Sequence, residues 1–284
     1  MLAYILSQPR SGSTVLTAML DKRKGVVCMP ESSFPQALGV VSRKERDDRR
    51  WMAALYLGST FPPTPLSFED ALACMEGSDE QILHALGRAL ATKIGRDPTE
   101  VRTIVWKTTR TIGMHRGPLS TSGRFIVLRR HPHNVFESQS RFDYGVRNRR
   151  PLRYAFFAQS YEYALSRLPV DRTFLINYDD AEKRLSELLG FLQLDDRGTW
   201  ETGSSSLDLV AKSCSWLAQI TEEFRNTDVE KRARLTPETL KLVDRSLALT
   251  RPLRSFMGPV RAHSDRRSMS HIWDFARQRL AENS

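Results

Sequence analysis

A short polar segment near the amino end carries the residue types that bind a tetrahedral anion. It reads Pro-Arg-Ser-Gly-Ser-Thr over residues 9–14, between the apolar run 1–7 and a helical pattern. Glycine lets the backbone turn tightly, and the first N–H groups of the helix point at a bound anion. A plain helix N-cap made by a serine is the alternative interpretation. The predicted anion-binding residues are Arg10, Ser11, Gly12, Ser13 and Thr14.

The same segment differs from the loop that binds a metal-bound nucleoside triphosphate. That loop reads GxxxxGK[ST], and here the first glycine is missing and Ser13, not lysine, follows Gly12. No strand ends in an obvious Mg²⁺-binding aspartate, and no spacing of histidines and cysteines suggests a metal site. We therefore expect an anion at this loop and no metal.

A second candidate anion site lies in the stretch "RRHPHNVFESQS". Arg130 ends an apolar strand pattern, Pro132 suits the first position of a helix, and Ser138 follows two turns later. An arginine at a strand end and a serine on the next helix can close around one phosphate. A strand-end arginine with an exposed serine is the alternative, and His131 is interpreted as a positional residue.

The elements that must hold these residues alternate between strands and helices. Such alternation predicts an α/β fold: a three-layer parallel sheet with helices on both faces, followed by a helical C-terminal part. Ligands of such sheets bind beyond the carboxyl ends of the strands, where every segment named above lies. The predicted strands are 1–7, 25–29, 101–107, 124–128 and 173–177, and the helices are 12–21, 68–75, 79–94, 132–142, 154–167 and 180–192.

Composition limits the class of protein. The 284 residues, 40% of them hydrophobic, suffice for one sizeable core, and the net charge of +10 favours acidic partners. Three cysteines without a paired spacing favour a reducing compartment. No apolar run reaches the roughly 20 residues of a membrane span, and the first residues lack the basic region of a signal peptide. We expect a cytoplasmic protein without a membrane span.

Taken together, the motifs resemble the sulfotransferases that use 3′-phosphoadenosine 5′-phosphosulfate (PAPS). The family's 5′-phosphosulfate loop resembles P-[KR]-S-G-[ST]-[ST], matched at 9–14, and its 3′-phosphate signature resembles R-x-P with a serine eight residues after the arginine. A third element, Tyr-Asp-Asp at 178–180 before "LLGFLQL", resembles the family's Tyr-Glu-Asp-Leu region. The resemblance implies a P-loop-like sulfotransferase fold in one domain, 1–284, with a PAPS-binding core at 1–195 and a mostly helical extension at 196–284.

The resemblance also implies roles for single residues. Arg10 would contact the 5′-phosphosulfate, and the hydroxyls and amides of 11–14 would hold the 5′-phosphate. Arg130 and Ser138 would bind the 3′-phosphate, and Tyr178 would lie near the adenine. A later basic residue of the family's 3′-phosphate site is expected at Lys212, Arg232 or Arg251.

A hydroxyl acceptor must lose its proton as it bonds to sulfur, so a general base is expected opposite the leaving group. The histidine that phenol-type relatives carry on the third strand is absent, because that stretch reads Lys107-Thr108-Thr109. Bacterial and glycan-type relatives often place a glutamate after the second strand, which here is Glu31. We predict Glu31 as the base and Lys107 as a cation at the transferring group. A solvated glutamate and an ordinary salt bridge are the alternatives.

The expected activity is sulfuryl transfer from PAPS to a hydroxyl acceptor, with a sugar or glycoconjugate favoured. The alternatives are a small-molecule kinase or other phosphate-binding transferase, a basic nucleic-acid-binding module, and a non-catalytic PAPS binder. Scattered aromatic residues argue against nucleic acid as a partner. Phe34, Phe61 and Trp51 line either an acceptor cleft or the core. A homo-oligomer is left open.

Overall fold

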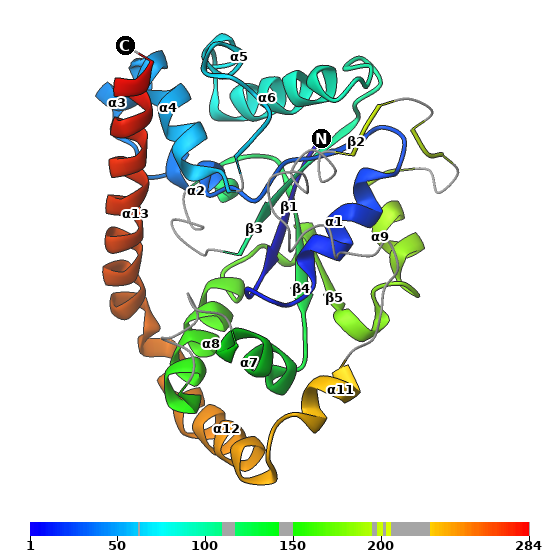
Figure 1. The fold of residues 1–284 in the computed structure, drawn as a ribbon, viewed down its shortest axis with the longest axis vertical. Helices are drawn as coiled ribbons and strands as arrows, with labels where there is room; N and C mark the ends of the chain where they lie inside the picture. The colour runs from blue at the N-terminus through cyan, green and yellow to red at the C-terminus, as the bar shows by residue number, and fades with distance from the viewer. Residues whose placement is uncertain are drawn as a thin grey trace.

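The computed structural model describes residues 1–61, 63–109, 117–141, 150–194, 198–200, 203–205 and 228–283, without the side chains of 258–268. A five-stranded sheet lies at its centre, with the strand order β2-β3-β1-β4-β5 and parallel pairing throughout. Figure 1 shows the strands between two groups of helices. The strands are β1 (Leu2–Ser7), β2 (Val26–Cys28), β3 (Thr103–Thr108), β4 (Arg124–Arg129) and β5 (Thr173–Asn177).

The sequence of β1 explains why this strand is central. All six of its residues are buried, as expected for a parallel strand that is covered on both faces. Leu2, Tyr4 and Leu6 point into one apolar cluster, while Ala3 and Ile5 point into the other. β1 pairs in parallel with β3 on one side and with β4 on the other. The segment after β1 therefore lies between the carboxyl ends of these two strands.

Helices cover both faces of the sheet. Apolar residues of α1 and α9 pack on one face, and those of α4, α6 and α8 pack on the other, with α13 packed on α4 and α8. The α-helices are α1 (Ser13–Asp21), α2 (Phe34–Leu38), α3 (Arg43–Asp47), α4 (Arg49–Ser59), α5 (Phe68–Ala73), α6 (Asp79–Lys93), α7 (Pro132–Ser140), α8 (Pro151–Leu165), α9 (Leu185–Phe191), α11 (Asp228–Ala233), α12 (Pro237–Thr250) and α13 (Met257–Glu282). The 3₁₀ helices are η1 (Pro118–Ser120), η3 (Val170–Arg172), η4 (Tyr178–Asp180) and η5 (Arg251–Phe256).

The last helix, α13, packs on α4 and α8, which lie much earlier in the chain. In Figure 1, α13 runs from the region of α8 and α12 up to α3 and α4, which it contacts. Gly58 permits the close approach, because a Cβ there would lie 2.9 Å from the Ala276 backbone nitrogen. The rings of Trp51 and Trp273 meet edge to face at 6.1 Å. The C-terminal helices are thus packed on the α/β part of the chain.

A third apolar cluster fixes the helices beside the predicted anion sites. Val135 and Phe136 of α7 pack with Tyr154 of α8 and Val243 of α12. The short helix α11 lies against α7. This cluster joins the C-terminal helices to the helix that carries Ser138.

The predicted α/β class, with a parallel sheet covered on both faces, is confirmed. Each predicted strand has an observed counterpart, although β2 is shorter than 25–29. The helix α4 has no counterpart among the predictions, because the charged start of its sequence conceals the buried run Trp51–Tyr56. Phe34 and Trp51 belong to the core, whereas the Phe61 side chain is 61% exposed. Within the described ranges, no helix has both the length and the apolarity needed to cross a bilayer.

Candidate functional site

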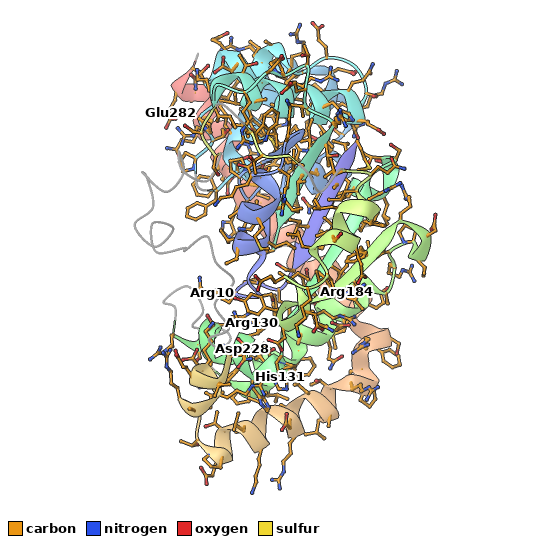
Figure 2. The ribbon with its side chains drawn as sticks, turned by 90° about the vertical axis from the view of Figure 1, so that its right-hand side faces the viewer. Arg10, Arg130, His131, Arg184, Asp228 and Glu282 are labelled. Carbon is orange, nitrogen blue, oxygen red and sulfur yellow. The ribbon has the colours of Figure 1, made fainter. Side chains whose placement is uncertain are left out.

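The predicted site residues come together beyond the carboxyl ends of the strands, with Glu31 after β2 and Tyr178 after β5. β1 lies between β3 and β4, so the segment after β1 has the end of β3 on one side and the end of β4 on the other. This is the place where parallel α/β sheets bind ligands. Figure 2 shows Arg10 and Arg130 near one another at this edge, with Asp228 beside them.

The loop after β1 has a conformation that few sequences adopt. Arg10 has φ 72° and Gly12 has φ 90°, both in the left-handed region. Gly12 also has no room for a side chain, because a Cβ would lie 2.1 Å from Cε2 of Tyr178. Hydrogen bonds within α1 begin with Val15 and Leu16, whose N–H groups donate to the Gly12 carbonyl at 3.0 and 3.2 Å. The earlier amides at the start of α1 have no partner within the helix and are suited to an anion.

Glu31, Lys107 and Thr14 form one connected group on the β3 side of the loop. The Lys107 ammonium donates to Thr14 Oγ1 at 2.9 Å and lies 3.1 Å from Glu31 Oε2. The hydroxyl of Thr109 donates to the other carboxylate oxygen of Glu31. The Lys107 side chain is only 6% exposed, whereas that of Glu31 is 28% exposed. A buried cation and an accessible carboxylate therefore lie next to each other beside the loop.

The second predicted anion site adjoins the loop on its β4 side. Arg10 Nε donates to Ser138 Oγ at 3.0 Å, and Arg130 Nη1 donates to the Arg10 carbonyl at 3.3 Å. Gln139 adds a bond from its amide to the Pro9 carbonyl at 2.9 Å. The two candidate sites, separated by more than a hundred residues in sequence, are thus directly hydrogen-bonded to each other.

Arg130 is held by groups from three parts of the chain. Its guanidinium lies 4.1 Å from the centre of the Tyr178 ring, which also lies against Gly12. Arg130 Nε donates to Asp228 Oδ1 at 2.9 Å, Nη2 donates to the same oxygen, and the Asn134 amide donates to Oδ2. The side chains of Arg130 and Asp228 are 5% and 2% exposed. A buried carboxylate therefore lies against the predicted 3′-phosphate arginine.

A further cation of the cluster is Lys231, one turn after Asp228 in α11. Burial lowers the pKa of its ammonium to about 8, with Arg130 and Arg10 acting in the same direction. The nearby carboxylates of Asp228 and Glu137 act in the opposite direction. Burial is the largest cause of this shift, and the charges of the two predicted anion-binding arginines add to it.

Lys231 differs from the three residues proposed above for this late position. Lys212 lies outside the described residues, Arg232 is exposed, and Arg251, also exposed, lines the cavity that opens beside Arg130. Lys231 is a further candidate, because the charge of Arg130 contributes to its lowered pKa.

A cavity of about 690 Å³ opens beside Arg130. Its size falls within the range of small-molecule sites. Burial raises the pKa of the Tyr178 hydroxyl on its wall, so this group stays protonated at neutral pH. The wall also includes Ser11 and Gln8, and Gln8 Oε1 is buried without a hydrogen-bond partner among the described residues. An unsatisfied buried acceptor at the edge of the cavity suits a ligand that brings a donor.

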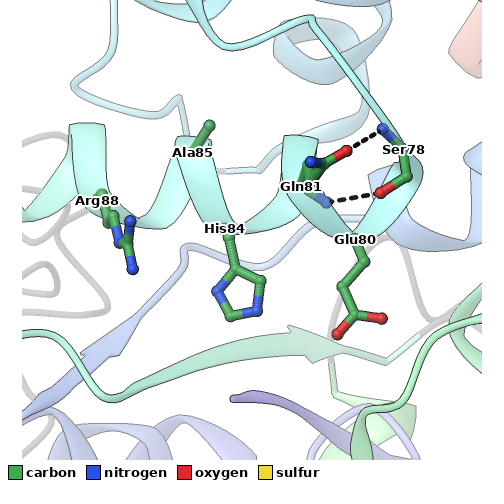
Figure 3. Close-up of a pocket in the computed structure, with 6 residues that line it drawn as sticks. All are labelled: Ser78, Glu80, Gln81, His84, Ala85 and Arg88. Carbon is green, nitrogen blue, oxygen red and sulfur yellow. Dashed lines mark hydrogen bonds between the residues drawn. The ribbon is translucent and has the colours of Figure 1, made fainter.

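A second cavity, of about 600 Å³, lies at the other end of the sheet (Figure 3). It follows the first turns of α6, where Ser78 and Gln81 cap each other. Glu80 on its wall accepts bonds from Ser122, two residues before β4 begins. Because it lies toward the amino ends of the strands, it is separate from the cluster around the loop.

Histidines near Arg130 have structural partners. His131 is the N-cap of α7, where its Nδ1 accepts the His133 N–H at 3.3 Å, as its positional interpretation implies. His133 in turn pairs with Asp244 at 2.7 Å. His115 lies outside the described residues. In the part of the chain that is described, no three histidine, cysteine or acidic side chains are grouped as metal ligands.

Four neighbours of the predicted residues were not found from the sequence: Thr109, Asn134, Asp228 and Lys231. Thr109 directly follows the strand end that supplied Lys107, and Asn134 lies in the first turn of the helix that carries Ser138. Their positions were therefore readable in principle. Asp228 and Lys231 carry no such signal, because they come from a helix 98 and more residues away.

Solved sulfotransferases share this architecture. A sulfotransferase domain from the curacin biosynthetic pathway matches with a TM-score of 0.50 at 21% identity, over 86% of this chain and 96% of that chain. The domain from the Synechococcus PCC 7002 olefin synthase gives 0.49 at 20% identity, over 86% and 93%. Mouse sulfotransferase SULT7A1, complexed with PAP, gives 0.44 at 12% identity, over 89% and 84%. At these identities the likeness concerns the fold alone.

Sequence comparison gives the family directly. No curated protein sequence matches this chain significantly. The sequence pattern of the sulfotransferase family, in contrast, matches residues 3–196, which include the loop, both strand-end clusters and the Tyr-Asp-Asp segment. This match spans more than half of the chain, and the fold agrees with it. The protein therefore belongs to the sulfotransferase family and is a sulfotransferase.

Proposed function

We propose that this sulfotransferase transfers the sulfuryl group of PAPS to a hydroxyl of a sugar or glycoconjugate, with Glu31 as the general base. One observation carries the proposal: Glu31 and Lys107 adjoin the loop on one side, and Arg130 with Ser138 adjoins it on the other. PAPS has a reacting sulfate and two phosphates. It therefore needs several neighbouring anion sites, which the loop and the groups on its two sides can supply. The electropositive groups Arg10, Lys107, Arg130 and Lys231 suit its charge.

The reaction balances with the groups present. The acceptor oxygen bonds to sulfur as the bond from sulfur to the 5′-phosphate oxygen breaks, and the Glu31 carboxylate takes the hydroxyl proton. The products are the sulfate ester and adenosine 3′,5′-bisphosphate (PAP). Sulfuryl transfer spreads charge over the non-bridging oxygens as phosphoryl transfer does, so positioning and fixed cations contribute most of the rate. Lys107 would stabilise the transferring group, and Arg10 with the amides of α1 would stabilise the leaving phosphate.

The acceptor is expected on the Glu31 side of the loop. The Phe61 N–H donates to the Glu31 carbonyl at 2.7 Å, so the exposed Phe61 ring is attached beside the proposed base. An exposed aromatic ring offers apolar surface to the face of a sugar. Phe61→Ala is then expected to raise KM for a sugar acceptor with little change in the affinity for PAP. Assays of PAPS turnover with sugars, glycoconjugates and a simple phenol test this assignment.

The first experiment is binding of PAP and of ATP with Mg²⁺, measured by calorimetry and thermal unfolding on the wild type and on Arg130→Ala. A ligand present at 100 times its Kd adds about 2.7 kcal/mol to the stability of the folded state, which is a visible shift. We expect selective binding of PAP that is lost in Arg130→Ala. Arg124→Ala is the matched control, because Arg124 begins the same strand and lies over the Phe191 ring.

Two outcomes would contradict the proposal. Preferred binding of ATP with Mg²⁺ would favour a kinase-like site, and binding of neither nucleotide would remove the basis for PAPS as the donor. PAP binding without turnover of PAPS on any acceptor would favour the non-catalytic binder. The cytoplasmic location and the oligomeric state stay predictions.

A further inference from the structure

The carboxylate of Asp228 occupies the place of an anion on Arg130. One of its oxygens accepts bonds from Nε and Nη2 of Arg130, and the other accepts a bond from the Asn134 amide. The guanidinium uses the same edge to bind a carboxylate as it would use to bind a phosphate. The pair is almost fully buried, and the guanidinium face is stacked on Tyr178.

The pair is surrounded by further cations, Arg10 and Lys231, with Glu137 as the other carboxylate that acts on Lys231. Arg10 is joined to Arg130 through its carbonyl group and to Ser138 through its side chain. Lys231 is close enough to both arginines that they lower the pKa of its ammonium. Removal of Asp228 from Arg130 would leave Arg130 and Lys231 as cations for a dianionic 3′-phosphate, with Arg10 between this position and the 5′-phosphate.

Asp228 and a 3′-phosphate cannot both bind Arg130 favourably. Two like charges in one buried site repel strongly, because the interior screens them less than water does. Nη1 of Arg130 is directed at the Arg10 carbonyl, so the phosphate would need the edge that Asp228 holds.

The Asp228 carboxylate can move away from Arg130 because it lies at the start of a short helix. Asp228 is the first residue of α11, a helix of six residues that lies on α7. Lys231 stands three residues later on the same helix, so one short element carries both a carboxylate that competes with the phosphate and a cation that attracts it. Figure 2 shows Asp228 next to Arg130, at the start of the C-terminal helices.

We propose that Asp228 is an internal competitor: its carboxylate fills the 3′-phosphate position in the unliganded protein and must leave Arg130 when PAPS or PAP binds. This inference rests on the proposed function, because it presumes that Arg130 binds the 3′-phosphate. Asp228 thereby weakens the binding of both donor and product. It selects for ligands whose 3′-phosphate can displace it, and α11 moves with the occupancy of the site.

Calorimetry with PAP and with AMP, which lacks the 3′-phosphate, tests the competition on the wild type, Asp228→Asn and Glu230→Gln. Asp228→Asn is expected to bind PAP at least tenfold more tightly than the wild type and to bind AMP within twofold of it. Glu230→Gln removes the same charge from an exposed position of α11 and is expected to leave both affinities within twofold. Unchanged or weaker PAP binding by Asp228→Asn would overturn the inference, since Asp228 would then only orient Arg130.

A crystal structure of the wild type with PAP gives a second test that does not depend on the folding of a variant. The expected result is Arg130 bonded to the 3′-phosphate, with the Asp228 carboxylate beyond hydrogen-bond distance of it. A complex in which Arg130 holds both anions would overturn the inference and leave the proposed function intact. Absence of PAP binding in the wild type and in Asp228→Asn would overturn both.

Discussion

Two buried pairs of arginine and aspartate lie at opposite ends of the sheet. Arg96 and Asp21 are 3% and 0% exposed, and Arg130 and Asp228 are 5% and 2% exposed. The first pair lies beside Val26, at the amino end of β2, and the second lies beyond the carboxyl end of β4. Their chemistry is the same, but their neighbours differ.

Backbone groups complete the hydrogen bonding of the pair formed by Arg96 and Asp21. Its guanidinium donates to both oxygens of Asp21, at 3.0 and 3.3 Å, and to the Val26 carbonyl at 3.2 Å, while the Cys28 N–H donates to Asp21 at 2.8 Å. The Trp200 ring covers the arginine. The Arg130 pair instead borders a cavity and two more cations. A pair that is surrounded by backbone groups stabilises the fold. A pair that borders a cavity and further cations is suited to exchange its carboxylate for another anion.

The largest expected effect is on stability and concerns the pair of Arg96 and Asp21. Arg96→Met leaves Asp21 as a buried charge without its partner, so the free energy of unfolding is expected to fall by about 3–5 kcal/mol. Urea unfolding measures this change, with the exposed Arg102→Met as a control that stays within about 0.5 kcal/mol of the wild type. A loss below about 1 kcal/mol for Arg96→Met would contradict the structural role.

Glu31→Gln is expected to give the next effect, a fall in kcat of about 10²–10⁴, because the amide cannot take the acceptor proton. The affinity for PAP, measured by calorimetry, is expected to stay within twofold, since the proposed role of Glu31 is toward the acceptor and not toward PAP. Glu69→Gln changes an exposed glutamate and is the control. Turnover at the wild-type rate by Glu31→Gln would show that another group is the base.

Lys107→Met is expected to lower kcat by about 10²–10³, the usual cost of removing one preorganised electrostatic contact to a transition state. Stability should change little, because the Glu31 carboxylate left behind is partly hydrated at 28% exposure. The exposed Lys93→Met, which loses a bond to Asp70, is the control. A large loss of stability at unchanged kcat would instead assign Lys107 to an ordinary salt bridge.

The sequence was most informative about site residues that are carried by elements adjacent in the chain. The loop at 9–14, Arg130 with Ser138, and the strands that carry them were predicted because a strand, its turn and the next helix are adjacent in the chain. The buried α4 was missed because its charged start resembles a surface segment. The partners of Arg130 were missed because Asp228 reaches it across 98 residues, through packing that no local pattern encodes.

The smallest expected effect is the one that the titration of Lys231 has on PAP affinity. It also separates binding from stability, because the two are expected to change with pH in opposite directions. A bound phosphate stabilises the charged ammonium, whose pKa is about 8 in the unliganded protein, so PAP affinity is expected to fall as the pH rises past 8. Between pH 7 and 9 the fall is about tenfold, because about a tenth of the lysine remains charged at pH 9. Calorimetry across this range is expected to show the fall in the wild type and not in Lys231→Arg or Lys231→Met.

Stability of the ligand-free protein should respond with the opposite sign. The pKa of Lys231 lies below its ordinary value of 10.5, so between pH 8 and 10.5 the unfolded chain binds the proton that the folded protein has released. Stability relative to Lys231→Met therefore rises over this interval and is lowest below pH 8. If unfolding and PAP binding instead change in the same direction, Lys231 is not the titrating group. The cation beside Arg130 would then have to be sought elsewhere in the chain.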